Sequence, residues 1–131
     1  MDLLKVENEV KTQLKVRVTR ILDGRFPNIS FTDEYSDNIK SFPNVYIHEL
    51  EPTELGVTLE NKSINALRDT IQVIVTTNTN KADAKAVIDA VVMSMKALSF
   101  TILSLPIHTR NNNLHTYVVR CNRVIASGDS F

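Results

Sequence analysis

Residues 70–98 decide the fold of this chain, and they read TIQVIVTTNTNKADAKAVIDAVVMSMKAL. In the first part, residues 70–77, side chains alternate between two faces, with Ile71, Val73 and Val75 on one of them. A period of two and a high content of β-branched residues are typical of a half-buried strand. We therefore predict a strand over residues 70–77, which ends at the polar residues that follow.

The second part of the same stretch changes to the period of an α-helix. Five apolar residues recur there at spacings of three and four, namely Ala84, Val87, Val91, Met95 and Leu98. Such spacing places all five on one stripe of a helix. Asn80 is expected to cap the helix N-terminus, with Asp83 in the first turn, where a carboxylate suits the helix dipole. Met93 and Met95 are both expected to pack in or near the core.

Another amphipathic helix is predicted at the N-terminus. Its apolar stripe consists of Leu3, Val6, Val10, Leu14, Val18 and Ile21. Gly24 suits a helix C-cap and Pro27 prevents continuation, so the helix is expected to end near Leu22 or Asp23. The chain therefore supplies two helices that each need an apolar surface to cover.

The remaining segments are predicted to be strands, loops and a turn. Strands are predicted over residues 29–32, 44–50, 100–107 and 115–125. Loops are predicted over residues 33–41 and 51–65, and a hairpin turn over residues 110–113. Pro106 is expected to mark the edge or the end of its strand. This order of elements predicts an α+β fold, one domain over residues 1–131, with two amphipathic helices packed on a mainly antiparallel sheet of four to five strands.

The composition limits the classes of function. The chain has 131 residues, 43% of them apolar, and its 15 basic and 15 acidic residues cancel to zero net charge. A neutral chain has no global attraction for nucleic acid or for an anionic membrane, and it is poorly protected against self-association. No run approaches the ~20 apolar residues needed to span a bilayer, and residues 1–5 lack the features of a secretory signal. The single cysteine, Cys121, cannot form an internal disulfide. Together these observations favour a protein made in a reducing cytoplasm, with no membrane partner.

Few side chains are available for catalysis or metal binding. The histidines are His48, His108 and His115, and Cys121 is the single thiol. His108 and His115 flank the predicted turn and are expected to face each other across the hairpin, but a metal or catalytic site needs a third partner. Cys121 shares a face with apolar residues of its strand and is expected to be a small buried hydrophobe. No metal, cofactor or catalytic residue is predicted.

The arginines form two groups. Arg17, Arg20 and Arg25 lie near the end of the first helix. An anion or acidic partner is one interpretation of this group, and stabilisation of the helix C-terminus by positive charge is the simpler one. Arg120 and Arg123 lie on opposite faces of the last strand, so at least one of them is expected to be exposed, or paired with an acid across an interface.

Several features occur in an order that is typical of one protein family. The first helix leads through Pro27 to a short strand, followed by FPNVYI at residues 42–47 and a glycine-containing loop that ends in LEN at residues 59–61. The strand and helix of residues 70–98 come next, and the chain closes on RCNRVIASGD at residues 120–129. In this combination, over nearly its whole length, the sequence resembles the tail terminator (tail completion) proteins of long-tailed bacteriophages, particularly those that infect Gram-positive bacteria.

The resemblance implies a non-enzymatic structural protein without a cofactor. Members of the family are small α+β subunits that form a hexameric ring on the upper end of the tail tube, stop its polymerisation and present the surface that joins the head. The implied partners are other copies of the chain, the tail tube protein and a head-completion or connector protein, while DNA passes through the ring without specific binding. The implied location is the head-proximal end of the tail in the virion, after assembly in the host cytoplasm.

Exposed loops, the turn and the last strand supply the candidate contacts in such a ring. These residues are Asp33, Glu34, Asp37, Glu54, Leu55, Val57, Leu59, Arg110, Arg120 and Arg123. Two other functions stay open. One is a head-tail connector or minor head-completion protein of the same kind of phage, and the other is a small ligand-binding or metal-dependent domain that uses His108 and His115. In the ring, residues 70–98 are expected to be a rigid support for the loops.

Overall fold

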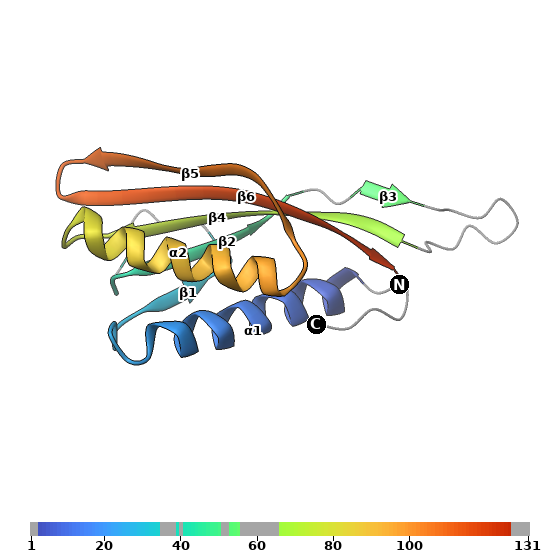
Figure 1. The fold of residues 1–131 in the computed structure, drawn as a ribbon, viewed down its shortest axis with the longest axis horizontal. Coiled ribbons are helices and arrows are strands. Elements are labelled where there is room, and N and C mark those ends of the chain that lie inside the picture. The colour runs from blue at the N-terminus through green and yellow to red at the C-terminus, as the bar shows by residue number, and fades with distance from the viewer. Residues whose placement is uncertain (1–2, 35–38, 40, 51–52, 56–65, 127–131) are drawn as a thin grey trace, which may run out of the picture.

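The computed structural model describes residues 3–34, 39, 41–50, 53–55 and 66–126. Its elements are α1 (Leu3–Leu22), β1 (Ser30–Thr32), β2 (Asn44–Glu49), β3 (Thr53–Leu55), β4 (Ala66–Thr77), α2 (Lys81–Ala97), β5 (Thr101–Asn111) and β6 (Leu114–Ala126). The strands form one layer and the two helices lie together on one side of it (Figure 1). The predicted α+β class is confirmed.

The sheet is built around two long central strands. Its order is β1-β2-β4-β6-β5, and the short β3 pairs with the start of β4. All 12 residues of β4 pair with β6, from Ala66 opposite Ala126 to Thr77 opposite His115. Neighbouring strands are antiparallel except β1 and β2, which run parallel. The two edges of the sheet are therefore β1 and β5, which are far apart in the sheet order.

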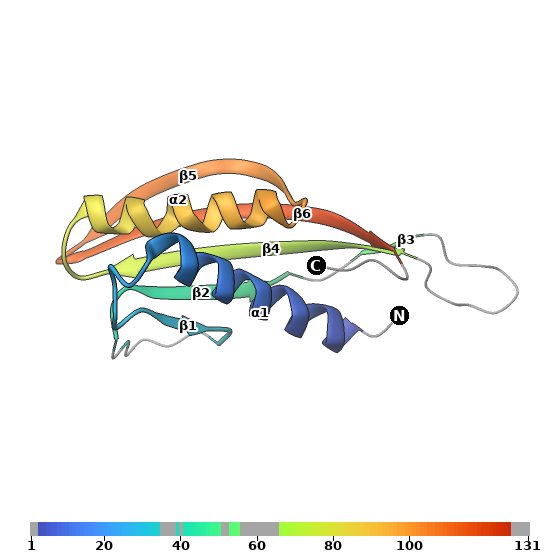
Figure 2. The ribbon, with the colours of Figure 1, turned by 60° about the horizontal axis from the view of Figure 1, so that its bottom comes forward.

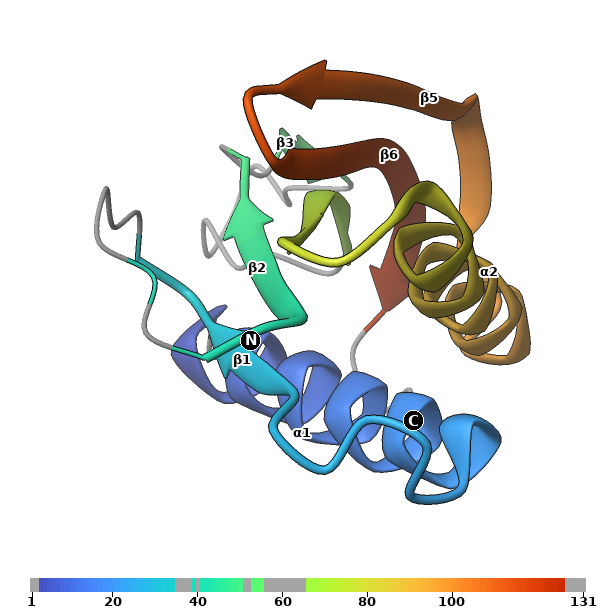
Figure 3. The ribbon, with the colours of Figure 1, turned by 90° about the vertical axis from the view of Figure 1, so that its left-hand side faces the viewer.

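The core fills the space between the sheet and the helices. All five residues of the predicted α2 stripe are buried, as are Ile71, Val73 and Val75 on the facing side of β4. From α1, Val10 and Leu14 join the same apolar cluster. α2 packs over β4, β5 and β6, and α1 lies beside α2 and crosses the β1–β2 half of the sheet (Figures 2 and 3). Full burial of such side chains stabilises the fold by ~1.5–3 kcal/mol each.

The start of α2 and the end of α1 lie where the capping residues in the sequence predict them. Asn80 accepts a hydrogen bond from the backbone N–H of Asp83 through its side-chain Oδ1 at 2.8 Å, so the predicted N-cap is confirmed. α1 ends at Leu22, where Asp23 and Gly24 take positive φ angles of 47° and 75°. A left-handed residue after the last turn is the usual way to end a helix, and Gly24 adopts it at the lowest steric cost.

Two predicted core positions on the helices are wrong. Met93 is 59% exposed, whereas Met95 is buried. Two residues along a helix correspond to a rotation of about 200°, so the methionines lie on opposite sides of α2. Ile21 is 42% exposed, because its neighbour Leu22 takes the place against the core at the last turn of α1.

Several predicted boundaries also change. β4 begins at Ala66 rather than at residue 70, because pairing with β3 and β6 extends it. β5 continues through Pro106 to Asn111, since an edge strand tolerates a residue without an N–H donor. The turn is consequently shorter than residues 110–113, and Asn112 takes a positive φ of 55° there.

The two predicted loops are only partly described. The segment 51–65 contains β3 rather than loop alone, and its residues 51–52 and 56–65 lie outside the described residues. In the segment 33–41, the described residues belong to no helix or strand, and residues 35–38 and 40 lie outside the description.

Candidate functional site

His108 and His115 meet across the β5–β6 hairpin, as predicted. Nε2 of His108 lies 3.0 Å from Nδ1 of His115, with the ring centroids 5.3 Å apart and the ring planes 21° apart. One imidazole donates a hydrogen bond and the other accepts it, so at least one ring nitrogen of the pair is unprotonated. The Tyr117 ring lies against His108, with centroids 5.2 Å apart.

Positive charge surrounds this histidine pair. Desolvation lowers the pKa of His108 below its usual 6.5, and the charges of Lys81, His115 and Arg110 lower it further. Among the described residues, no group of three or more His, Cys, Asp or Glu side chains is arranged to hold a metal ion. The geometry accounts for the pair as a hydrogen bond that ties the two strands together next to the turn.

Cys121 is buried on the core side of β6, as predicted. Its thiol donates a weak hydrogen bond to the backbone oxygen of Ile71, at 3.7 Å. Burial raises the pKa of Cys121 to about 12, and the negative charge of Asp69 contributes to the shift. Because the thiolate is the reactive form of cysteine, this side chain is chemically quiet in the folded protein.

Asp69 was missed by the sequence analysis, which began the strand one residue later. It is only 1% exposed, and no hydrogen bond reaches its Oδ2 within the described structure. Burial raises the pKa of Asp69 to about 6, and the charge of Glu7 raises it further. A charge at residue 69 signals exposure in the sequence, and only the long pairing of β4 with β6 places this carboxyl against the core.

The arginines near the end of α1 do not converge on a common anion. The guanidinium of Arg25 lies 3.6 Å from the carboxylate of Asp83, in the first turn of α2, and 5.1 Å from the centre of the Phe26 ring. Arg20 is exposed, while Nε of Arg17 is buried without a hydrogen-bond partner in the described structure. Arg25 thus connects the end of α1 to the start of α2.

Two of the predicted contact residues, Asp33 and Glu34, directly follow the edge strand β1. Both are exposed. Asp33 accepts a hydrogen bond from Nζ of Lys11 at 2.9 Å, and this bond and the lysine charge lower the pKa of Asp33. Glu34 makes no ion pair with a described residue, which leaves one acidic side chain free beside the β1 edge.

The predicted arginine contacts occupy three different settings. Arg110 is exposed near the end of β5, and its Nε donates to the backbone oxygen of Asn112 at 3.2 Å. Arg120 is exposed on β6 and donates from Nε to the side chain of Gln72 at 2.8 Å. Arg123 is half-buried on the helix side, where Nη1 donates to the backbone oxygen of Leu98 at 3.0 Å. The expectation that at least one of Arg120 and Arg123 is exposed is confirmed.

The other predicted contacts belong to the segments with partial description. Glu54 and Leu55 lie in β3, opposite Leu67 and Ala66 of β4. Asp37, Val57 and Leu59 lie outside the described residues.

The sequence analysis also missed three exposed apolar side chains on β5. Leu103, Leu105 and Ile107 of β5 are 51%, 81% and 67% exposed. The alternation of these three residues is visible in the sequence, but the sequence analysis predicted a strand there without assigning its faces. Ile107 pairs with Val118, next to the pair of His108 with the buried Tyr117, so the Ile107 side chain lies on the face of the sheet that the helices do not cover.

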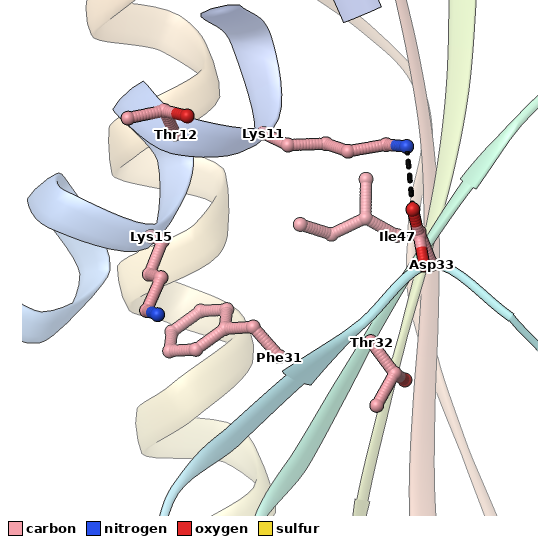
Figure 4. A pocket seen from close by; sticks show the side chains of 7 residues that line it. All are labelled: Lys11, Thr12, Lys15, Phe31, Thr32, Asp33 and Ile47. Atoms are coloured by element: carbon pink, nitrogen blue, oxygen red, sulfur yellow. Dashed lines mark hydrogen bonds and ion pairs between the residues drawn. The ribbon is translucent and has the colours of Figure 1, made fainter. Parts of the chain in front are cut away.

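A groove lies at the other end of the sheet, between α1 and the strands β1 and β2. Its volume is about 240 Å³, and its lining consists of Lys11, Thr12, Lys15, Phe31, Thr32, Asp33 and Ile47. The lysine of the Lys11–Asp33 ion pair reaches from α1 to the carboxylate beyond β1 (Figure 4). The groove therefore combines apolar side chains with a charged rim.

A scan of the chain against protein-family models finds no match, and a search of curated protein sequences finds no match. Within the described residues, neither helix is long and apolar enough to cross a membrane.

Proposed function

We propose that this chain is a non-enzymatic subunit of a bacteriophage tail terminator. Copies of the chain form a ring on the head-proximal end of the tail tube, which ends tube polymerisation and provides the surface for head attachment. The sequence resemblance suggests this function, and the family implies a hexamer. The ring assembles in the host cytoplasm and remains in the virion.

The exposed edge strand β5 is the observation that carries this proposal. A long edge strand with three exposed apolar side chains is a hazard for a free monomer, because it invites association with another chain. In a ring subunit, the same surface is covered by a neighbour. The exposed apolar side chains of this edge strand therefore favour an assembly function over that of a monomeric binding domain.

The two sheet edges also differ in the way that a ring requires. Cyclic assemblies of more than two subunits use two different, complementary flanks on each subunit. Here β5 is an apolar edge of 11 residues, whereas β1 has 3 residues and leads into Asp33 and Glu34. The long β4–β6 pair, covered by α2, is a stiff connection between these flanks.

The proposed partners follow from the position of the ring. The tail tube protein contacts one face of the ring, a head-completion or connector protein contacts the other, and DNA passes through the centre. The zero net charge suits a passage for DNA, because tight phosphate binding needs an excess of Lys and Arg. No cofactor takes part in this function.

The direct test uses tail tubes assembled from the major tail protein of the same phage. Electron microscopy and the distribution of tube lengths are compared with and without the purified chain. We expect the chain to sit at one end of each tube and to stop further growth. Tubes that keep growing with no bound ring would refute the proposal, and binding to tail-less heads instead of tubes would point to the connector function.

A further inference from the structure

A row of apolar side chains crosses the face of the sheet that the helices do not cover. Tyr46 of β2 pairs with Ile74 of β4, and Val118 of β6 lies between Ile74 and Ile107 of β5 in the strand registers. On β2, β4 and β6, the residues on either side of these positions in the sequence are buried in the core, so the row lies on the opposite face. Ile107 is 67% exposed, and the other three side chains are half-buried. We call these four residues the apolar row.

Polar rows run beside the apolar row on both sides. Their members pair in the same registers, with His48, Gln72, Arg120 and Ser104 in one row and Asn44, Thr76, Thr116 and Thr109 in the other. Two residues along a strand correspond to roughly 7 Å, which separates each polar row from the apolar row. The apolar surface is therefore a stripe only one side chain wide.

The charges on this face of β2, β4, β5 and β6 are positive. Arg120 is exposed and donates from Nε to Gln72, and its terminal nitrogens form no hydrogen bond or ion pair with any residue that the structure describes. Arg68 is also exposed there. The acids of these strands, Glu49 and Asp69, lie at register positions of the helix-covered face. A partner that covers the helix-free face must therefore bring its own carboxylates to pair with Arg120.

An α-helix of another molecule suits this pattern better than a second sheet does. Two packed sheets need apolar side chains on several adjacent rows, whereas the rows beside the apolar row are polar. The same face of a second copy is excluded by charge, because it offers arginines and no carboxylate to Arg120. The apolar stripes of α1 and α2 are already buried in the fold, so neither of them is free to occupy this face.

The dimensions of the rows match one short helix. The apolar row crosses four strands, or three spacings of about 4.8 Å, which gives a length of roughly 14 Å. At about 1.5 Å per residue, roughly ten helical residues cover it, with apolar side chains at spacings of three and four. A helix diameter of about 10–12 Å places the flanks of the helix over the two polar rows.

We propose that the helix-free face of this sheet binds an amphipathic helix of another protein, with the apolar stripe of that helix on the apolar row and its acidic flank against Arg120. The contact uses side chains of the sheet face and no backbone group of a sheet edge. Leu103 and Leu105 lie outside the apolar row, in the part of β5 where the register shifts. The inference therefore goes beyond the proposed ring function and does not depend on it.

The first experiment measures binding of two designed peptides to the full chain by fluorescence anisotropy. Each peptide has roughly 14 residues, is held helical by a side-chain staple on its polar side, and carries leucines at spacings of three and four. One has glutamates along one flank of the leucine stripe, and the other has lysines there. At low ionic strength, we expect the glutamate peptide to bind at least about tenfold more tightly. Equal affinities, or no binding of the glutamate peptide, would overturn the proposal.

Variants of the chain test the two parts of the contact. Arg120→Glu is expected to reverse the preference, so that the lysine peptide binds more tightly. Ile107→Ser is expected to weaken both peptides by at least about fivefold, because it removes apolar contact. Met93→Ser, a matched control at an exposed aliphatic side chain of α2, leaves both dissociation constants unchanged. Circular dichroism spectra that match the unaltered chain show that each variant is folded, and a preference that survives Arg120→Glu contradicts the proposed ion pair.

NMR of methyl groups locates the bound peptide. With the glutamate peptide present, the methyl signals of Ile74, Val118 and Ile107 are expected to shift, while those of Ile88 and Val91 on the buried side of α2 stay in place. Shifts that are confined to the helices would place the peptide elsewhere and refute the proposal.

Two further measurements separate the alternatives. A single-stranded oligonucleotide is the competing polyanion, and oligonucleotide binding that Arg120→Glu abolishes, without binding of the glutamate peptide, would replace the helix by nucleic acid and overturn the proposal. Tube capping is measured independently. A chain that caps tubes but ignores the glutamate peptide keeps the proposed function and loses this inference, and a chain that binds the peptide but caps no tubes does the reverse.

Discussion

Replacing the buried carboxyl of Asp69 by an amide is expected to stabilise the protein at neutral pH. Asp69 is 1% exposed and its Oδ2 has no hydrogen-bond partner in the described structure. The charge of Glu7 opposes ionisation of Asp69, and Arg123 is the residue paired with Asp69 in the β4–β6 register. Nη1 of Arg123 donates to the backbone oxygen of Leu98. Asp69→Asn retains the shape of the side chain and removes its charge.

The size of the expected stabilisation follows from the raised pKa of Asp69. Burial first, and then the charge of Glu7, raises the pKa of Asp69 from 3.8 to about 6 in the folded protein. A raised pKa means that the folded state holds the proton more tightly, so this stabilisation is complete below pH 3.8 and is lost as the pH rises through 6. At ~1.4 kcal/mol per pH unit, the ionised carboxylate costs at most about 3 kcal/mol at pH 7.5.

The assay is denaturant unfolding of the wild type and Asp69→Asn at one protein concentration, from pH 4 to pH 7.5. We expect a gain of about 1–3 kcal/mol in the free energy of unfolding at pH 7.5, which shrinks toward zero at pH 4. Asp89→Asn is the control. Its carboxylate is exposed and pairs with Lys85 one turn away, so a change within about 0.5 kcal/mol is expected.

The opposite sign would refute this reasoning. If Asp69→Asn loses stability at pH 7.5 and the loss disappears at pH 4, the carboxylate is ionised and held by a favourable charge. Arg123 is then the first residue to replace, because it is paired with Asp69 in the β4–β6 register.

Three further predictions concern the core, the hairpin and the thiol. Val73→Asp or Val91→Asp buries an unpaired charge, so each is expected to lower the free energy of unfolding by more than about 4 kcal/mol and to abolish folding. Met93→Asp, at an exposed position of α2, is expected to fold normally. Soluble, folded Val91→Asp protein would contradict the placement of α2. The pKa of His108 is lowered in the folded protein, so the contribution of this histidine to stability is complete above pH 6.5 and falls as the pH drops below that value. NMR titration of the His108 ring measures the pKa, and a value above 6.5 would disprove the prediction. Cys121 is expected to react with a thiol reagent only at the rate of unfolding, and fast labelling of the native protein would show that its burial is wrong.

The residues of the candidate contact surfaces could be predicted only in part from the sequence. Arg110, Asp33 and Glu34 were expected at contacts because they are charged and lie at or beside predicted loops. The exposed apolar side chains of β5 were not identified, because an alternating strand has the same pattern whichever of its faces a helix covers. The pairing of β5 with β6 decides the face, and it places Ile107 on the side away from the helices.

The sequence by itself determined the local structure of this protein. The change of hydrophobic period within residues 70–98, the cap at Asn80 and the stop at Gly24 depend on neighbours within a few residues, so the pattern contains all the information that they need. The tertiary structure decided the rest. β4 gains four residues and buries Asp69 because β3 and β6 pair with it, and β1 and β5 become unlike edges because pairing between distant segments sets the strand order. Those pairings depend on contacts between residues far apart in the chain, which a local period does not encode.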